Sequence, residues 1–527
     1  MAHGVIMQED RVFIDHSGQM YRIKSPQPLE EPPKNLRIAR RSQPWSIYSR
    51  MLGTVLPAFF LMYTLLFIIL GLVSLEPVIV LASSICSAPL VFLILRLHRP
   101  RLVHVRLAVP DPSGSEAHAL PEGGSLRTPM KTSMSRFLVN DDSILDVPPS
   151  RQLWSLFAAM ISIGVATSYM LLAVSETIGI IIFLFLAIPL WLIGFSLPVL
   201  AWWGTSNKLL GLPTRRRDAE AWLMAGMASA FPAFIFNSLV APEIVPFEQQ
   251  SQGFEFILLA FWAPICEEIF KAMAVAIFFP FIMGPKHGFQ VGFTVGLGFA
   301  LIENFQYIGL SVFGGPASAS FTILVRGIGS IPGHAIWTAI SGTAIGWLAS
   351  DKQLRQRVSS KARSIAISAI DLAEGVGIDV DGDGDLSGFD GDRENPEEAP
   401  QPIQVSGHEG GSNSWMIIGS EEDDMVDNDL KSKFSSSDFI LSYGDEYSGK
   451  KPVGFLPPRG LLPALLVSIL GHSFWNGSSY ISFIAPTEWL GLSPGEGLGV
   501  MLLWTLFLIS SVLLIARGLI RGVNSLE

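Results

Sequence analysis

Ten segments of this chain, each about 20 residues or longer, contain few or no charged side chains. A helix of roughly 20 apolar residues spans the hydrocarbon core of a bilayer, which is about 30 Å thick. The composition agrees, because 49% of the 527 residues are hydrophobic and only 16% are charged. The segments lie near residues 53–75, 77–95, 153–174, 177–203, 219–241, 255–283, 289–313, 320–349, 461–484 and 497–516. We therefore predict an all-α polytopic membrane protein with about ten transmembrane helices.

Lys and Arg are concentrated in every second connection between these segments, for example at residues 96–106, 215–217 and 450–459. The intervening connections carry Glu instead and almost no basic residues. Basic connections stay on the cytoplasmic side of a membrane. The first 50 residues are polar and show no cleavable signal peptide. We expect a multi-pass protein of the cell membrane with both termini in the cytoplasm and the lipid bilayer as its surroundings.

The segments divide the chain into five predicted parts. Residues 1–50 form a cytoplasmic arm, and residues 51–250 an N-terminal bundle of about five helices with a polar loop of little hydrophobic periodicity near 107–150. Residues 251–350 form a transmembrane core, which helices in 459–527 complete. Between them lies an acidic, largely disordered cytoplasmic insert at 351–458.

The insert has 22 acidic and 10 basic residues between Asp351 and Lys451 and thus accounts for the negative net charge of the chain. Its segment DVDGDGDLSGFD, residues 379–390, resembles a twelve-residue calcium loop, with Gly384 at the turn. A solvated acidic linker is the alternative interpretation. The candidate calcium ligands are Asp379, Asp381, Asp383, Asp385 and Asp390.

Ionisable and amide side chains occur at mid-membrane depth in the last five predicted helices. A charged residue at the centre of a transmembrane helix costs about 2.5–3.5 kcal/mol on insertion scales, so such residues usually face a polar cavity. The spacing of Glu267, Glu268 and Lys271 in CEEIFK allows the ammonium to pair with either carboxylate. The other polar residues at this depth are Glu303, Asn304, His334, His472 and Asn476, and Arg326 lies nearer an end of its segment.

Three kinds of chemistry suit this set of residues. Glutamate and histidine can activate a water molecule as general base and acid, they can bind zinc, or they can relay protons in an ion-coupled transporter. A non-catalytic receptor or scaffold is a further alternative, but interhelical hydrogen bonds in membranes average about 0.6 kcal/mol, too little to offset several buried ionisable groups. The first and last five segments show no internal repeat, which many transporters have.

Four motifs together resemble the PrsW family of intramembrane proteases, which is related to the Abi and CAAX-prenyl-protease group. They are EExxK at 267–271, GLGFALIENFQY at 296–307, PGHAIWTAISGTAIG at 332–346 and GHSFWNG at 471–477. The resemblance implies an endopeptidase that hydrolyses peptide bonds of membrane-associated protein substrates. We expect no nucleic acid partner, and the oligomeric state stays open.

Carried over from the family, Glu267 is the principal catalytic carboxylate, and Glu268 and Lys271 set its charge and position. His334 is the histidine of the third motif, and His472 and Asn476 match an HxxxN pair that stabilises the oxyanion. Glu303 stands where the CAAX-protease relatives have a histidine, so we assign it a supporting role with Asn304 and Arg326. Between the two mechanisms that these residues permit, we expect a glutamate-type one without cofactor, with a zinc-dependent one as the alternative.

Overall fold

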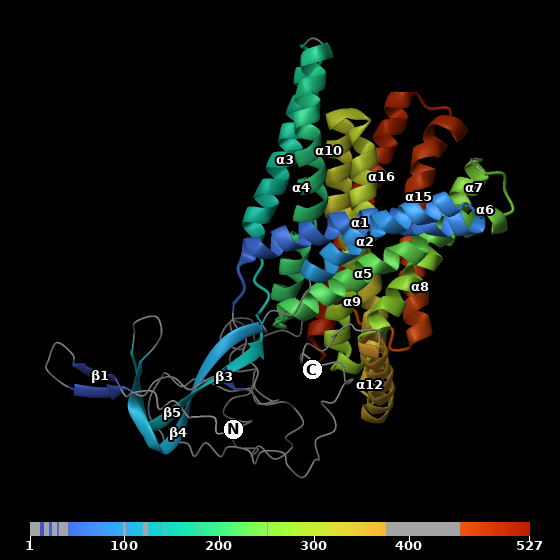
Figure 1. Cartoon of the computed structure of the whole chain (residues 1–527). Helices are drawn as coiled ribbons and strands as arrows, with labels where there is room; N and C mark the ends of the chain where they lie inside the picture. Colours follow the sequence, from blue (N-terminus) through green and yellow to red (C-terminus); the bar gives the residue numbers. More distant parts are fainter. Residues whose placement is uncertain are drawn as a thin grey trace. The chain divides into compact units, whose positions relative to one another are not determined.

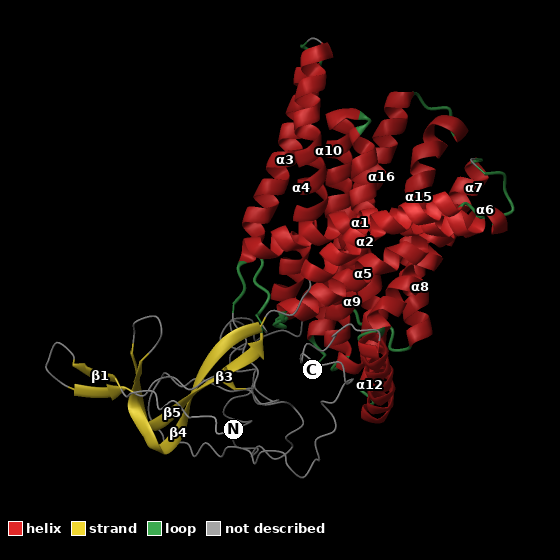
Figure 2. Cartoon of the chain, viewed as in Figure 1, coloured by secondary structure: helices red, strands yellow, loops and turns green. Residues whose placement is uncertain are grey.

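The structure is a computed structural model, and it describes residues 11–14, 20–23, 29–30, 41–97, 102–119, 125–141, 143–174, 176–249, 251–375 and 454–526. The described strands belong to one compact unit and the described helices to another. Figures 1 and 2 show the elements of both units.

The helical unit contains long helices, several of which are interrupted by short π-helical turns (Figure 1). The elements of its first half are α1 (Pro44–Val73), α2 (Pro77–Leu97), α3 (Ser150–Leu171), α4 (Glu176–Leu210), α5 (Arg216–Ile235), η1 (Phe236–Val240) and α6 (Ala241–Ile244). Those of its second half are α7 (Gln252–Ile257), η2 (Leu258–Trp262), α8 (Ala263–Ala276), η3 (Phe279–Phe281), α9 (Pro285–Val312), α10 (Gly315–Val325), η4 (Arg326–Ser330), α11 (Ile331–Ala349), α12 (Lys352–Gly375), α15 (Leu461–Ile484), η7 (Ala485–Trp489) and α16 (Pro494–Asn524).

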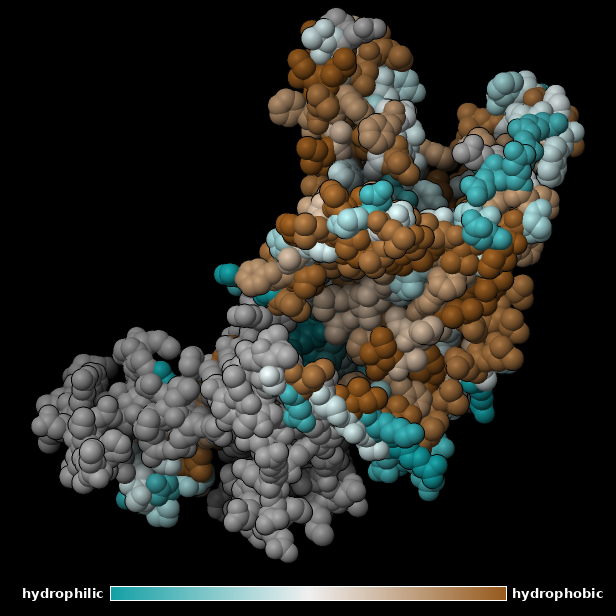
Figure 3. Space-filling model, turned by 45° about the vertical axis from the view of Figure 1, so that its right-hand side comes forward, coloured by the Kyte–Doolittle hydropathy of each residue, from teal (hydrophilic) through white to brown (hydrophobic). Residues whose placement is uncertain are grey.

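Seven of the described helices are long and apolar enough to cross a membrane. Hydrophobic residues also cover much of the visible face of the helical unit (Figure 3). The other three predicted segments, near 255–283, 320–349 and 461–484, are helical as well. In them, π-helical turns interrupt the helix or polar residues replace apolar ones. A polytopic, mainly helical membrane protein is thereby confirmed, while the count of about ten spans stays a prediction.

The strand unit corrects the prediction of a polar loop near 107–150. Strands β4 (Leu102–Ala119) and β5 (Ser125–Asn140) form a long antiparallel pair, and β3 (Leu29–Glu30) pairs with β5 in parallel. Strands β1 (Arg11–Ile14) and β2 (Met20–Ile23) form a separate antiparallel pair. Apolar residues alternate with others from residue 103 to 109, which is typical of a strand. A predicted loop that begins at 107 divides this alternation and therefore hides it.

The predicted insert at 351–458 is also more ordered at its start than expected. Its first residues form helix α12, which follows directly after α11. The candidate calcium loop at 379–390 lies outside the described residues.

Each of three π-helical turns is followed by an α-helical segment with proline at its second position. These prolines are Pro242, Pro264 and Pro332, whereas Pro486 is the second residue of the turn η7 itself. Proline has no N–H and its ring clashes with the carbonyl one turn earlier, so a wider π-helical turn accommodates it without ending the helix. Two of these turns, η2 and η4, lead directly into α8 and α11, which carry candidate site residues.

Helices α9 and α11 pack closely because glycines of one helix face the backbone of the other. A Cβ atom added at Gly292 of α9 would lie only 2.6 Å from the carbonyl oxygen of Thr338 and 2.9 Å from Ala339 Cα of α11. Gly288 and Gly342 face each other in the same way. Small residues at such an interface let two transmembrane helices approach.

We predict that Gly292→Ala destabilises the protein, because the new methyl group meets backbone that cannot move independently of its helix. Overpacking of this kind costs typically about 1–3 kcal/mol. The measurement is the thermal unfolding temperature in detergent, with Gly499→Ala in α16 as the control, since a Cβ there meets no atom within 4 Å. Equal unfolding temperatures for the two variants would show that α9 and α11 do not pack in this way.

Candidate active site

The nine polar residues predicted for the site lie together, although they come from four parts of the chain. They are Glu267, Glu268 and Lys271 of α8, Glu303 and Asn304 of α9, Arg326 and His334 of η4 and α11, and His472 and Asn476 of α15. Contacts between side chains join the members of this cluster. Its acidic, basic and imidazole groups on α8, α11 and α15 are at most 7% exposed.

Lys271 selects Glu268 rather than Glu267 as its ion-pair partner. Its ammonium lies 2.8 Å from Glu268 Oε1 but 3.7 Å from Glu267 Oε2. The same oxygen of Glu268 accepts a hydrogen bond from Nδ1 of His472, at 3.0 Å. Because His472 donates from Nδ1, its Nε2 carries a lone pair when the imidazole is neutral. A carboxylate behind a histidine in this way fixes the tautomer and orients the ring.

His334 is held from both sides. Its Nδ1 accepts a hydrogen bond from the Lys271 ammonium at 2.9 Å, and its Nε2 then donates to Glu303 Oε2 at 2.5 Å. Arg326 lies 2.7 Å from the same carboxylate oxygen and donates through Nε to the side chain of Asn304. Glu303 therefore joins the arginine to the histidine.

Glu267 makes the longest contacts of the three carboxylates in the cluster, since its nearest charged partner, Lys271, lies 3.7 Å away. Its Oε2 is buried and has no hydrogen-bond partner among the described residues. The lone pair of His472 Nε2 lies 3.8 Å from this oxygen. Asn476 Nδ2 donates to the same nitrogen over 3.3 Å. Both contacts of the His472 nitrogen are long, so this nitrogen and the Glu267 oxygen could each bind a further group in exchange for them.

Glu267, His334 and His472 could hold a zinc ion once one nitrogen of His334 gives up its contact to Lys271 or Glu303. Glu267, His334 and His472 each offer one ligand atom, and these atoms all lie within 4.8 Å of one another. Two histidines and one carboxylate are a common ligand set of catalytic zinc sites. The cluster contains three carboxylates and two cations, so with neutral imidazoles its formal charge is negative and favours a bound cation.

A cavity of about 10 Å³ adjoins the two histidines and is also lined by Ser330, Gly333, Trp337 and Trp475. This is about the room that one water molecule needs. The cavity lies on the side of the cluster where His334 and His472 meet, with ring centroids 4.8 Å apart.

Two residues that we did not predict support the cluster. The ring of Phe299 lies 3.9 Å from the Lys271 ammonium and covers it with its face. Ser468 donates to the carbonyl oxygen of Trp337 at 2.7 Å and thereby ties α15 to α11. Their positions offered a signal, since each precedes a site residue by four positions, Phe299 before Glu303 and Ser468 before His472, and so shares its helix face.

We predict that Lys271→Met destabilises the protein strongly and that Glu267→Gln does not. Removing Lys271 leaves Glu268 buried without its cation, and breaking a buried ion pair costs about 3–5 kcal/mol. Glu267 contributes no hydrogen bond through Oε2, so its neutral isostere removes little. The measurement is thermal unfolding of both variants in the same detergent. An equal loss in the two variants would contradict this assignment of partners.

Residues 219–371 match the family described as PrsW family intramembrane metalloprotease. No curated protein and no solved structure matches the chain. The matched part contains α8, α9 and α11 with Glu267, Glu303 and His334, whereas His472 and Asn476 on α15 lie beyond it. The resemblance to the PrsW family found in the sequence motifs is confirmed for residues 219–371 by this match.

Proposed function

We propose that this chain is an endopeptidase that hydrolyses peptide bonds of membrane-associated protein substrates, with Glu267, His334 and His472 at its catalytic centre. The observation that carries the proposal is the meeting of these three side chains, from three helices, around an unpaired buried carboxylate oxygen. The family match supports the same activity. The comparisons contain nothing that favours the transporter alternative.

The arrangement of the chain in the cell membrane belongs to this proposal. The charge pattern of the connections favours both termini in the cytoplasm, and the site residues then lie near the middle of their spans. Buried ionisable groups at this depth are costly unless they serve a function. A membrane-spanning segment of a substrate can reach them within the bilayer.

Hydrolysis requires that a water oxygen attack the peptide carbonyl, that the carbon–nitrogen bond break, and that a proton reach the leaving amine. Glu267 Oε2 is the free acceptor for the proton of the water, and it can return that proton to the amine. A carboxylate has two oxygens, so Glu267 can hold a cation with one and accept a proton with the other. The small cavity beside His334 and His472 has room for one water molecule, although Glu267 is not among its lining residues.

Other residues of the cluster position these groups. Glu268 orients His472, and Lys271 holds both Glu268 and His334. Arg326 and Asn304 fix Glu303, which holds the second nitrogen of His334. Asn476 Nδ2 makes only a long hydrogen bond to His472, so it can donate to the oxyanion that forms during attack.

A zinc ion would be held by Glu267, His334 and His472. When bound there, zinc supplies a Lewis acid that polarises the peptide carbonyl and lowers the pKa of water. This ligand set and the family description lead us to favour the zinc-dependent mechanism over the glutamate-type one expected from the sequence.

The first test is cleavage of a panel of single-span membrane proteins by purified wild type and by Glu267→Gln, with and without a chelator. We expect cleavage by the wild type, loss in Glu267→Gln, loss with chelator and recovery with added zinc. Activity that survives chelation but not Glu267→Gln would restore the glutamate-type mechanism. Full activity of a folded Glu267→Gln would refute the catalytic centre.

The second test addresses Asn476. We expect Asn476→Ala to lower kcat by about 10²–10³-fold, which is typical of the loss of one oxyanion donor. Its unfolding temperature should stay near that of the wild type, since the amide makes only the long contact to His472. Wild-type kcat in this variant would exclude Asn476 from the oxyanion site.

A further inference from the structure

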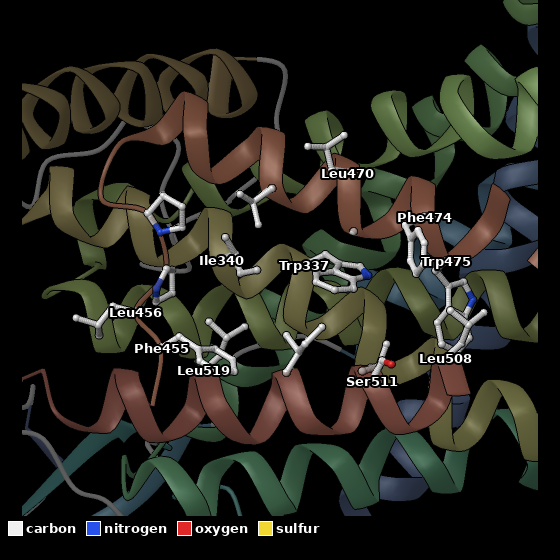
Figure 4. Close-up of a pocket in the computed structure, with 16 residues that line it drawn as sticks. Trp337, Ile340, Phe455, Leu456, Leu470, Phe474, Trp475, Leu508, Ser511 and Leu519 are labelled. Carbon is white, nitrogen blue, oxygen red and sulfur yellow. The ribbon is translucent and has the colours of Figure 1, made fainter. Parts of the chain in front are cut away.

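Beside the candidate active site lies an apolar groove of about 550 Å³ between α11, α15 and α16. Figure 4 shows the side chains that line it, among them Ile340, Leu470, Phe474 and Leu508. Ser511 is one of very few polar residues in the lining. Apolar residues are expected wherever a transmembrane helix faces lipid, so the lining alone indicates no function. The shape and the position of the groove carry the argument.

The groove adjoins the active site. Trp337 of α11 and Trp475 of α15 line both the groove and the small cavity beside His334 and His472. Figure 4 shows Trp337 and Trp475 toward the same end of the groove as Leu508. A molecule in the groove would therefore contact the same two tryptophans that line the cavity beside the catalytic histidines.

The opposite end of the groove is lined by the segment that precedes α15. The segment Phe455–Pro458 lies there, next to Leu519 of α16 (Figure 4). Phe455 N donates to the carbonyl oxygen of Gly518 at 3.2 Å, and the Phe455 ring occupies the space that a side chain at Gly518 would need. This segment thus bounds the groove at the end of the bundle where α15 begins and α16 ends, while Leu470 and Phe474 along its side are exposed.

The size of the groove limits what it can hold. A transmembrane helix about 30 Å long and 10 Å wide occupies on the order of 2,400 Å³. The groove of about 550 Å³ holds roughly a fifth of this, or about four residues. It suits a short stretch of a substrate and is too small for an entire span.

We propose that this groove is a specificity subsite, which binds a run of about four large apolar residues in the substrate's membrane span. The run lies next to the scissile bond, on the side toward the end of the bundle where α15 begins. The inference rests on the proposed function and names the substrate class for it: membrane proteins with Leu-, Ile- or Phe-rich sequence at this position. Substrates with Ala or Gly there leave the groove unfilled and bind less well.

The test introduces a phenylalanine side chain on α16 that occupies part of the groove. Ser511→Phe places a ring among the lining residues, whereas Ser510→Phe changes the neighbouring residue, which does not line the groove. The two serines are a matched pair, because each hydroxyl donates to the carbonyl oxygen four residues earlier. Each variant is assayed with two single-span substrates that differ only in carrying four Leu or four Ala residues beside the scissile bond.

Wild type and Ser510→Phe should cleave the Leu substrate with a higher kcat/KM than the Ala substrate. Ser511→Phe should reduce this ratio by about tenfold or more. Apolar pockets discriminate by about 10–200-fold per methylene, so the change is measurable. An equal loss of both substrates, or an unchanged preference, would overturn the subsite. A lipid in the groove would produce the equal loss of both substrates. Failure of the wild type to cleave any membrane protein would instead refute the proposed function, and the subsite with it.

A second measurement reads binding without cleavage. A photoreactive residue in the Leu run should cross-link to Phe474 or Leu508 in the Glu267→Gln protein, and Ser511→Phe should abolish these cross-links in the same background. Cross-links confined to residues outside the groove would contradict the proposal.

Discussion

The ion pair between Glu268 and Lys271 is the interaction on which the rest of the site depends. Both groups are buried, and removing a charge from water costs several kcal/mol unless a partner and further hydrogen bonds compensate for it. Further hydrogen bonds compensate for the burial of both charges, since Glu268 also accepts from His472 and Lys271 also donates to His334. Each imidazole thereby receives a defined tautomer from a charged neighbour. The glycine contacts between α9 and α11 bring Glu303 close enough to complete the chain with Arg326.

This arrangement explains why Glu267 differs from its neighbour in the sequence. Adjacent residues on a helix point about 100° apart, so only one of two consecutive glutamates can lie directly over the lysine. Glu268 takes that position, and Glu267 faces the two histidines with an oxygen that makes no hydrogen bond among the described residues. An unsatisfied buried carboxylate destabilises a fold, and such groups persist where chemistry requires them. The free energy lost by burying the Glu267 carboxylate without a close partner is therefore what we relate to the proposed activity.

Much of this site could be predicted from sequence, because charged residues in apolar helices have few acceptable surroundings other than one another. The depth of Glu267, His334 and His472 in their segments indicated a common level, and the motifs indicated the family. The sequence could not decide which glutamate pairs with Lys271, since both spacings allow contact. It also gave no sign of the groove, whose residues are individually ordinary for transmembrane helices. The β4–β5 pair was missed because its alternation was divided by an assumed loop boundary.

The central claim is that α8, α11 and α15 build one centre, although α15 lies beyond the part of the chain that matches the family. Zinc content per chain, measured by mass spectrometry on purified protein, tests it most directly. The account predicts one zinc in the wild type and in the control His287→Ala, whose ring packs against Trp222 away from the cluster. It predicts loss of zinc in both His334→Ala and His472→Ala. Full zinc content in His472→Ala beside a loss in His334→Ala would contradict the claim, and zinc-free wild type would contradict the metal assignment.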